Sequence, residues 1–419
     1  MIPSINVTIW GKPVGSLVET GSGRNCQICF YFDPMFVRSG LDIAPLRASI
    51  NGIVAQKGMP IYPEKDRLYG GLPSFIADSM PDHWGHLVFS QWAKAHNINM
   101  KNITVLDRLA YIGRRGMGAL EFMPPTSAEM ETSFKVEIDR LSNLAQTILT
   151  QAKDFKAQLS HDLIVESLFR VGTSAGGRRP KALINVNPES GECYSGQVAT
   201  ELPGFIPMII KFDEHIDLPT TRMEYAYYLM AQQAGLRMMP SRLLVGKDEV
   251  HFLTQRFDRN GNEKLHVQTL AAMDPYSTSY EELFVVAHKL ELPQEDLKQL
   301  FLQTALNFMA ANVDDHNKNF SFVMDCHGKW RLTPAYDFTF TVDPSAPSYV
   351  NRHSLTLNGK DHDVSDKDLL ELATSFDIKG GRRMLDAAHE AVENFAEHAK
   401  TAGLTPEVAD LIMRNHNVG

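Results

Sequence analysis

The feature of this sequence that most constrains its fold is a change of pattern near Phe257. Before that point, short apolar or alternating runs are typical of strands, as in "KALINVN" and "FIPMIIKFD", the second with the composition of a strand buried on both faces. After about Arg259, apolar residues recur at helical spacing, as in "DLKQLFLQTALNFMAA" and in the tail from Arg382 to Asn415. The sequence therefore predicts an α+β protein, with a mixed β-sheet N-terminal lobe followed by a mostly helical C-terminal lobe.

Turn signals divide the chain further. "INVTIWGKPVGSLV" predicts two strands around a Gly-Lys-Pro turn, and "GRRGMGALEFMPP" adds a glycine-rich turn and another strand. The polar stretch "VEIDRLSNLAQTILTQA" has apolar residues at helical spacing and predicts a connector helix. We therefore expect a small leading α/β subdomain at residues 1–125, an N-lobe region at 126–257 and the helical C-lobe at 258–419.

Composition excludes several classes of protein. With 43% hydrophobic and 22% charged residues, the 419-residue chain is unlike a disordered or fibrous protein. A net charge of -9 argues against non-specific binding of nucleic acid by the whole surface. The N-terminus lacks a secretory pattern, and no run reaches the roughly 18 to 20 apolar residues of a membrane span. We expect a cytoplasmic protein with no membrane segment, in which the lone CxxC pair of Cys26 and Cys29 serves packing.

The segment "NVDDHNKNFSF" follows an apolar helical stretch and places an aspartate five positions before an asparagine. Transfer of a phosphoryl group from ATP needs a carboxylate to receive the acceptor's proton and oxygen ligands for Mg²⁺. The catalytic loop of protein kinases supplies both with the interval that separates Asp314 from Asn319. Alone, the pattern is better explained by a hydrated turn whose side chains bond their own backbone.

Three further segments occur in the order of a kinase. Asp337 stands in "AYDFT" after a strand-like run, where a kinase carries its second metal ligand. Lys211 ends the apolar strand "MIIK", from which an ammonium group can pair with nucleotide phosphates. "GTSAGGRRPKA" places glycines between strands, where backbone amides can approach phosphate oxygens. Their joint occurrence favours phosphoryl transfer over a coincidence of turns.

Glu224 has two explanations that the sequence leaves open. It lies in "TRMEYAYYLMAQQAG", a predicted helix that ends at Gly235. Thr221 and Glu224 have the Thr-x-x-Glu spacing of a capping box, which would give the carboxylate a structural role. A helical glutamate thirteen residues after Lys211 is also the arrangement that holds a nucleotide-binding lysine in place.

At this point the chain resembles the HipA-type serine/threonine kinases, the toxins of bacterial toxin-antitoxin pairs. "SFIADSMPDHWG" and "GRRGMGALEFMP" are similar to the family's leading domain, and "TSAGGRRPKA" to its phosphate loop. "VDDHNKNFSF" and "LTPAYDF" are similar to its catalytic and metal-binding segments, and "RHSLTLNG" to the stretch that follows. The resemblance covers nearly the whole chain and implies a two-lobed, protein-kinase-like fold.

The resemblance also implies site residues. Asp314 would be the catalytic base, with Lys318 beside it in the catalytic segment, and Asn319 and Asp337 would bind Mg²⁺. The residues it implies for ATP binding are Gly176, Gly177, Arg178, Arg179, Lys181, Lys211, Glu224, Gln255, Arg256, Phe257, His316 and Tyr336. Ser174 aligns with the loop serine that these kinases phosphorylate on themselves, and the added charge would oppose the closed, ATP-holding loop.

Two departures from the family pattern matter. Asp315 stands where the family often has glycine, which leaves open which of the two aspartates works, although the spacing to Asn319 favours Asp314. Arg178 and Arg179 make the phosphate loop unusually basic, and they suit either ATP or phosphorylated Ser174.

For partners, the resemblance implies a small helix-turn-helix antitoxin similar to HipB, which would bring the chain to DNA. It also implies a protein substrate such as an aminoacyl-tRNA synthetase. Two other functions stay open. An aminoglycoside-type phosphotransferase shares the Asp-x4-Asn pattern, but it would not explain the leading domain or Ser174. A catalytically inert co-repressor that only binds the antitoxin would not need Lys211, Asp314, Asn319 and Asp337.

Overall fold

The computed structural model describes residues 3–21, 27–65, 70–125, 134–153, 179–196, 202–214, 218–246, 249–261 and 263–417. The chain forms two compact units, each of which is described by itself. Unit 1 comprises Met1–Glu214, Leu253–Gln268 and Met324–Lys329, and unit 2 comprises His215–Phe252, Thr269–Val323 and Trp330–Gly419. Three strands run across this division: β9 (Val250–Gln255), β12 (His266–Thr269) and β13 (Ser321–Met324). No helix within the described ranges is long and apolar enough to cross a membrane.

Unit 1 begins with an antiparallel sheet in the order β3-β2-β1-β4, formed by β1 (Ser4–Ile9), β2 (Lys12–Thr20), β3 (Gln27–Phe32) and β4 (Leu120–Met123). Buried and exposed residues alternate along β1, because one face of the strand packs on the core. Trp10 and Gly11 form the turn between β1 and β2, and both have positive φ, as a tight two-residue hairpin requires. The expected hairpin is confirmed, but its turn consists of Trp10 and Gly11, so Lys12 and Pro13 already belong to β2.

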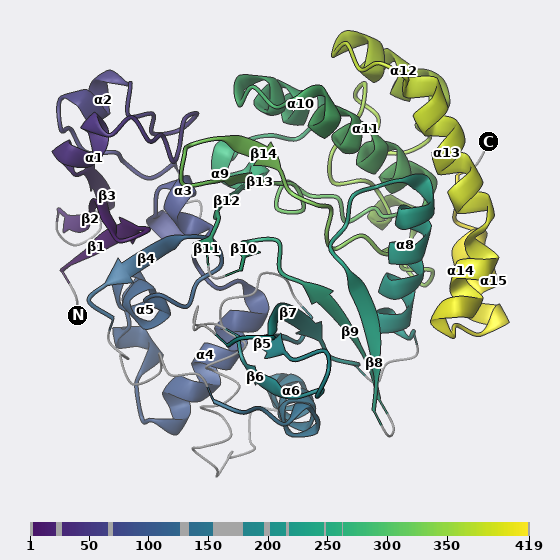
Figure 1. The fold of residues 1–419 in the computed structure, drawn as a ribbon, viewed down its shortest axis with the longest axis horizontal. Helices are drawn as coiled ribbons and strands as arrows, with labels where there is room; N and C mark the ends of the chain where they lie inside the picture. The colour runs from purple at the N-terminus through teal and green to yellow at the C-terminus, as the bar shows by residue number, and fades with distance from the viewer. Residues whose placement is uncertain are drawn as a thin grey trace. The chain divides into compact units, whose positions relative to one another are not determined.

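Among the helices of unit 1, α1 contacts β2 and α5 contacts β1 and β4, and Figure 1 shows α5 beside β4. The helices are α1 (Pro34–Arg38), α2 (Ile53–Gln56), α3 (Ser74–Ala77), α4 (His83–Ala95), the short 3-10 helix η3 (Met100–Asn102) and α5 (Val105–Ile112). Cys29 of β3 is buried, in agreement with a packing role, whereas Cys26 lies outside the described residues.

A second antiparallel group in unit 1 places β5 (Lys181–Val186) between β6 (Cys193–Ser195) and β7 (Ile206–Lys211). All six residues of β5 are buried, whereas β7 is buried mainly toward Lys211. In the strand order β6-β5-β7-β9, β7 lies between β5 and β9, and none of its residues is exposed. This agrees with the expectation that "FIPMIIKFD" contains a strand buried on both faces, although β5 is buried more completely. The expected connector helix is α6 (Ile138–Lys153), and the short pair β10 (Arg259–Asn260) and β11 (Glu263–Lys264) completes the unit's elements.

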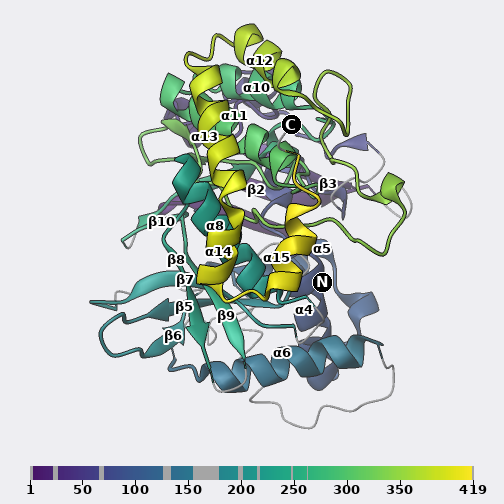
Figure 2. The same cartoon turned by 90° about the vertical axis from the view of Figure 1, so that its right-hand side faces the viewer.

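Unit 2 is mostly helical. Its elements are α8 (Thr220–Ala234), β8 (Ser241–Val245), α9 (Leu270–Met273), α10 (Tyr280–Lys289), α11 (Gln294–Met309), β14 (Trp330–Leu332), the 3-10 helix η5 (Ser348–Val350), α12 (Asp366–Ser375), α13 (Gly381–Glu393), α14 (Phe395–Ala402) and α15 (Pro406–Met413). Figures 1 and 2 both show α8, α13 and α14 side by side. The prediction of an α+β chain with a mostly helical C-terminal part is confirmed.

Candidate active site

Helix α11 positions the acidic loop. Every residue from Leu300 to Met309 is buried, so the helix is fixed on all sides by the core of unit 2. Ala311 then adopts a left-handed conformation with φ of 55°, which ends the helical path of the chain. The side-chain amide of Asn312 donates to Oδ1 of Asn307 on α11 over 2.9 Å, so the first residue of the loop is held by the helix.

Asp314 and Asn319 are brought together within this loop. The side-chain nitrogen of Asn319 donates to the main-chain oxygen of Asp314 over 2.6 Å, and its N–H donates to the main-chain oxygen of His316 over 2.8 Å. Because the amide nitrogen closes the loop, Oδ1 is the atom of Asn319 suited to bind a cation. The Asp314 side chain is 63% exposed, so its carboxylate faces solvent.

Asp315 is fully buried and accepts hydrogen bonds from three different groups. The hydroxyl of Tyr280 and Nδ1 of His353 lie 2.5 Å and 2.9 Å from Oδ2, and the N–H of Ser354 donates to Oδ1 over 2.7 Å. Burial and the nearby Asp315 raise the pKa of Tyr280, which keeps its hydroxyl protonated as a donor. Asp315 therefore holds the loop in place, and this favours Asp314 as the carboxylate that faces a substrate.

His316 and Lys318 lie in the same loop. The N–H of Lys318 donates to Nδ1 of His316 over 3.3 Å, so a neutral His316 ring carries its proton on Nε2. That nitrogen lies 4.0 Å from Oδ1 of Asp314. The hydroxyl of Tyr336 donates to the main-chain oxygen of Lys318 over 2.7 Å and also contacts Oγ of Ser321. Tyr336 thus ties the segment after β14 to the end of the loop.

Asp337 lies between two points at which its segment is bound to the loop. Tyr336 contacts the oxygen of Lys318, and Oγ1 of Thr341 accepts the N–H groups of Val313 and Asp314 over 2.7 Å and 3.0 Å. Asp337 itself has φ of 50°, a conformation that non-glycine residues adopt rarely and that concentrates at functional sites. This places a second carboxylate on a segment anchored to the Asp314–Asn319 loop.

Lys181 and Lys211 are directly opposite each other in the register of β5 and β7 in unit 1. Both are buried, with 3% and 8% of their surface exposed. Side chains in directly opposed positions of an antiparallel pair lie on the same face of the sheet, so the two lysines share one face of β5 and β7. The indole N–H of Trp84 donates to the main-chain oxygen of Lys181 over 2.9 Å and anchors the start of β5 to α4.

The predicted phosphate loop is only partly visible. Arg179 is the first residue of this loop that the structure describes, and its Nε lies 3.6 Å from Oε1 of Glu214. Ser174, Gly176, Gly177 and Arg178 lie outside the described residues, so their roles stay predictions.

The capping-box explanation of Glu224 is wrong. Helix α8 begins at Thr220 with Pro219 as its N-cap, and no side chain caps it. Thr221 lies inside the helix, and its hydroxyl donates to the main-chain oxygen of Val250 over 2.6 Å. Glu224 is 4% exposed, so a buried carboxylate remains that capping does not explain.

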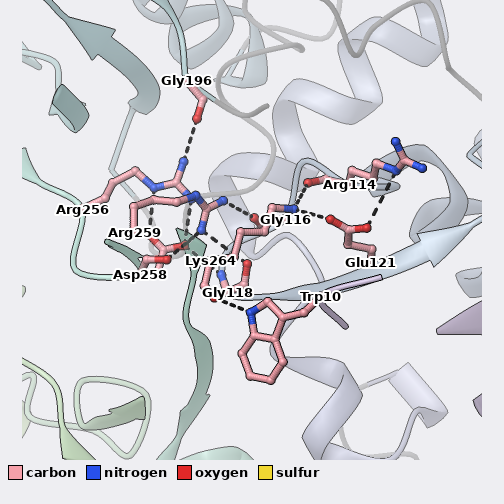
Figure 3. A network of polar contacts seen from close by, with 10 residues as sticks. All are labelled: Trp10, Arg114, Gly116, Gly118, Glu121, Gly196, Arg256, Asp258, Arg259 and Lys264. Atoms are coloured by element: carbon pink, nitrogen blue, oxygen red, sulfur yellow. Dashed lines mark hydrogen bonds and ion pairs between the residues drawn. The ribbon is translucent and has the colours of Figure 1, made fainter. Parts of the chain in front are cut away.

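The "QRF" segment leads into a buried charge network in unit 1. Gln255 ends β9, and it and Phe257 are half-buried. The guanidinium of Arg256 makes two hydrogen bonds of 2.8 Å to the carboxylate of Asp258 and one of 2.7 Å to the main-chain oxygen of Gly196 (Figure 3). Arg256 therefore has a structural role in binding Asp258 and Gly196, and its proposed role in the adenine pocket stays a prediction.

Asp258 lies at the centre of this network. Its Oδ2 accepts the N–H of Gly118 over 2.8 Å and a guanidinium N–H of Arg259 over 2.5 Å (Figure 3). Burial alone would raise the pKa of Asp258, but Arg256 and Arg259 hold it far below its usual range. Gly118 has φ of 75°, which suits glycine and aims its N–H at the carboxylate. Asp258 thus holds the segment after β9 to the loop that precedes β4.

The donor atoms of the site suit ATP with Mg²⁺. Carboxylate and amide oxygens are the ligands that Mg²⁺ prefers, and nucleotide sites commonly use only one or two protein ligands beside the phosphates. Asp337 and Oδ1 of Asn319, both in unit 2, fit that requirement. Among the residues described, no group of three or more His, Cys, Asp or Glu could hold a metal ion by itself.

Several residues that position the loop were missed by the sequence prediction: Tyr280, Thr341, His353 and Ser354. Each makes its bond to the loop over at least 27 positions of the chain. Their one sequence signal was "RHSLTLNG", whose similarity to the family was noted without a role for His353 or Ser354.

Comparisons with known proteins give two family matches. Residues 173–403 match the HipA-like C-terminal domain, and residues 5–123 match the HipA N-terminal domain. No curated protein sequence matches the chain.

Solved structures give the fold. A HipA chain from the complex of the Shewanella oneidensis MR-1 toxin-antitoxin system HipA, HipB and its operator DNA matches with a TM-score of 0.66 and 14% sequence identity, over 98% of this chain and 94% of that chain. The Helicobacter pylori proinflammatory kinase CtkA matches with a TM-score of 0.34 and 14% identity, over 50% of this chain and 88% of its own. The first match shows that the chain has the fold of that HipA structure, and the expected HipA-like α+β class is confirmed.

Proposed function

Because the chain belongs to the HipA family, to whose C-terminal domain more than half of its residues match, we propose that it is an ATP-dependent serine/threonine protein kinase. It would act as the toxin of a HipA/HipB-type pair. The observation that carries the proposal is the loop from Asp314 to Asn319, in which the exposed carboxylate and the amide that closes the loop have the kinase interval.

The reaction is transfer of the γ-phosphoryl group of ATP to a serine or threonine hydroxyl. The hydroxyl oxygen forms a bond to the γ-phosphorus, the bond to the β–γ bridging oxygen breaks, and ADP leaves. Bound Mg²⁺ neutralises charge that develops on the phosphate oxygens. Asp314 orients the hydroxyl and accepts its proton, as its exposure at the surface of the loop allows. Asn319 and Asp337 would hold the metal.

The N-lobe residues would bind the nucleotide. Lys181 and Lys211 would contact its phosphates, and their opposed positions on β5 and β7 place both on one face of the sheet. Glu224 would hold Lys211, and His316 and Lys318 would lie near the transferred group. The further residues proposed to contact ATP are Gly176, Gly177, Arg178, Arg179, Gln255, Arg256, Phe257 and Tyr336. Phosphorylation of Ser174 by the chain itself would switch it off.

The cellular role follows from the same family. We propose a small helix-turn-helix partner similar to HipB, through which the chain reaches operator DNA, as in the complex of the Shewanella protein. The substrate would be a translation protein such as an aminoacyl-tRNA synthetase in the cytoplasm, so activity would arrest growth. The domains would be the leading subdomain at 1–125, the N-lobe region at 126–257 and the C-lobe at 258–419.

The test is incubation of the purified chain with γ-labelled ATP and Mg²⁺, followed by mass analysis of the labelled residues. We expect phosphate on serine or threonine of the chain and strong loss of labelling in Asp337→Asn. The exposed Asp363 of the same unit, with a side chain that is 90% accessible, offers Asp363→Asn as a matched control that keeps labelling. Absence of both ATP binding and labelling in the unaltered chain would contradict the proposal.

A further inference from the structure

The segment from Asp343 to Asn351 forms a closed loop in unit 2. The side chain of Asn351 accepts the N–H of Asp343 and donates to the main-chain oxygen of Asp343, each over 2.9 Å. Inside the loop, the N–H and hydroxyl of Ser345 bind the Asp343 carboxylate, and these hydrogen bonds lower the pKa of Asp343. Pro344 and Pro347 restrict the backbone further, so the loop is preorganised.

Both ends of this loop are bound to the proposed catalytic loop. On its N-terminal side, Thr341 accepts the N–H groups of Val313 and Asp314. On its C-terminal side, His353 and Ser354 bind the carboxylate of Asp315. The closed loop therefore lies between two segments that are bound to the proposed catalytic loop, one at Val313 and Asp314 and the other at Asp315.

The closed loop exposes large apolar side chains to solvent. Tyr349 is 73% exposed and Val350 is 56% exposed, and both lie on the 3-10 helix η5. The polar side chains of Asp343, Ser345 and Asn351 are bonded within the loop, whereas Tyr349 and Val350 expose apolar surface. Adjacent exposed apolar side chains on a preorganised loop mark a contact site rather than core.

The length of the chain limits how far these side chains lie from the reaction. Four residue steps separate Tyr349 from His353, and at 3.8 Å between consecutive Cα atoms the two Cα atoms lie within about 15 Å. His353 in turn contacts Asp315, the neighbour of Asp314. An extended peptide advances about 3.3 Å per residue, so about five residues of a bound peptide cover the greatest Cα distance between Tyr349 and His353.

From this placement we propose that Tyr349 and Val350 form the docking surface for the protein substrate. They would bind a large apolar side chain that lies within about five residues of the phosphorylated serine or threonine. This inference rests on the proposed kinase function and specifies which acceptor sequences the site prefers.

The test uses peptides with one central serine and a single variable residue at each of the five flanking positions on either side. For each protein, kcat/KM of peptides with leucine or phenylalanine is divided by kcat/KM of the matching glycine peptide. We expect the unaltered chain to favour the apolar peptide at one or more positions. The double variant Tyr349→Ser, Val350→Ser should lower that ratio by about tenfold or more, the discrimination typical of one apolar group in an apolar site.

The matched control is Tyr276→Ser, Val285→Ser. It removes the same two side-chain types from exposed positions of unit 2, where Tyr276 and Val285 are 56% and 41% exposed, and it should keep the ratio of the unaltered chain. An equal ratio in the Tyr349/Val350 variant and the control would overturn the inference. A chain that labels itself with phosphate but shows no preference, or accepts no peptide, would overturn it while the kinase function stands. A chain with no transfer to any acceptor would overturn both.

Discussion

The hydroxyl of Tyr280 donates a hydrogen bond of 2.5 Å to the buried carboxylate of Asp315, and it also accepts one of 3.0 Å from the side-chain amide of Asn307 on α11. The Tyr280 hydroxyl therefore links Asn307 of α11 to Asp315 of the proposed catalytic loop. The buried side chain of Asp315, the residue after Asp314, thus holds the loop in position.

Replacing Tyr280 with phenylalanine should destabilise unit 2, because it removes a donor to a buried carboxylate. We expect a loss of roughly 1–3 kcal/mol in the free energy of unfolding, measured by urea denaturation. Tyr276→Phe is the control, since Tyr276 is 56% exposed, and it should change stability little. Equal stabilities of the two variants would show that the bond to Asp315 contributes nothing.

The buried Asp258 should be more sensitive still. Asp258→Asn leaves two guanidinium groups, those of Arg256 and Arg259, without their counter-charge in the interior of unit 1. Removal of one partner from a buried ion pair typically costs roughly 3–5 kcal/mol, which thermal and denaturant unfolding would detect. Glu189→Gln, at an exposed turn of the same unit, is the control. A variant as stable as this control would contradict the network drawn in Figure 3.

Lys211 should contribute to nucleotide affinity. Lys211→Ala removes a charged donor beside Lys181, and a charge-assisted bond is worth roughly 1.5–3 kcal/mol, so the Kd for ATP should rise about ten- to a hundredfold. Titration calorimetry in the presence of Mg²⁺ measures this change. The control is Lys12→Ala, at the exposed start of β2, which should keep the affinity of the unaltered chain. The same Kd in both variants would show that Lys211 does not bind the nucleotide.

His416 should make stability depend on pH. Burial lowers the pKa of His416 from 6.5 to about 4, and Tyr227 lies beside its ring. Between pH 4 and pH 6.5 the unfolded chain binds more protons than the folded one. The contribution of His416 to the free energy of unfolding is therefore fully present above pH 6.5 and is lost as the pH falls toward 4. The slope attributable to this residue is at most about 1.4 kcal/mol per pH unit.

Unfolding curves at several pH values would test this dependence. His416→Gln should flatten the slope between these pH limits, whereas His362→Gln, at a side chain that is 51% exposed, should keep it. An identical slope in both variants would show that protonation of His416 is not coupled to unfolding.

Much of the fold was predictable because its signals are local. The β1–β2 hairpin follows from alternation over a few residues, and α8 ends where predicted because Gly235 adopts the left-handed conformation with φ of 83°. The capping box at Thr221 and Glu224 failed for a physical reason. The chain enters α8 at Pro219, so Thr221 is already inside the first turn and its hydroxyl bonds to Val250 instead.

The site was predictable only in part. The interval from Asp314 to Asn319 is local, and the structure adds the hydrogen bond that closes it. The choice between Asp314 and Asp315 depends on Tyr280 and His353, which are 35 and 38 positions from Asp315. The opposition of Lys181 and Lys211 depends on the register of two strands separated by a long connection. Such non-local pairing leaves no pattern in a short stretch of sequence.

The most direct test of the proposed kinase is Asp314→Asn, a change that keeps the size of the side chain and removes its ability to accept a proton. Because ATP is proposed to be held by other groups, its Kd in the presence of Mg²⁺ should stay close to that of the unaltered chain. The rate of phosphoryl transfer from γ-labelled ATP should fall about a hundred- to ten-thousandfold, as expected for loss of a general base. Transfer by Asp314→Asn at the rate of the unaltered chain would contradict the account.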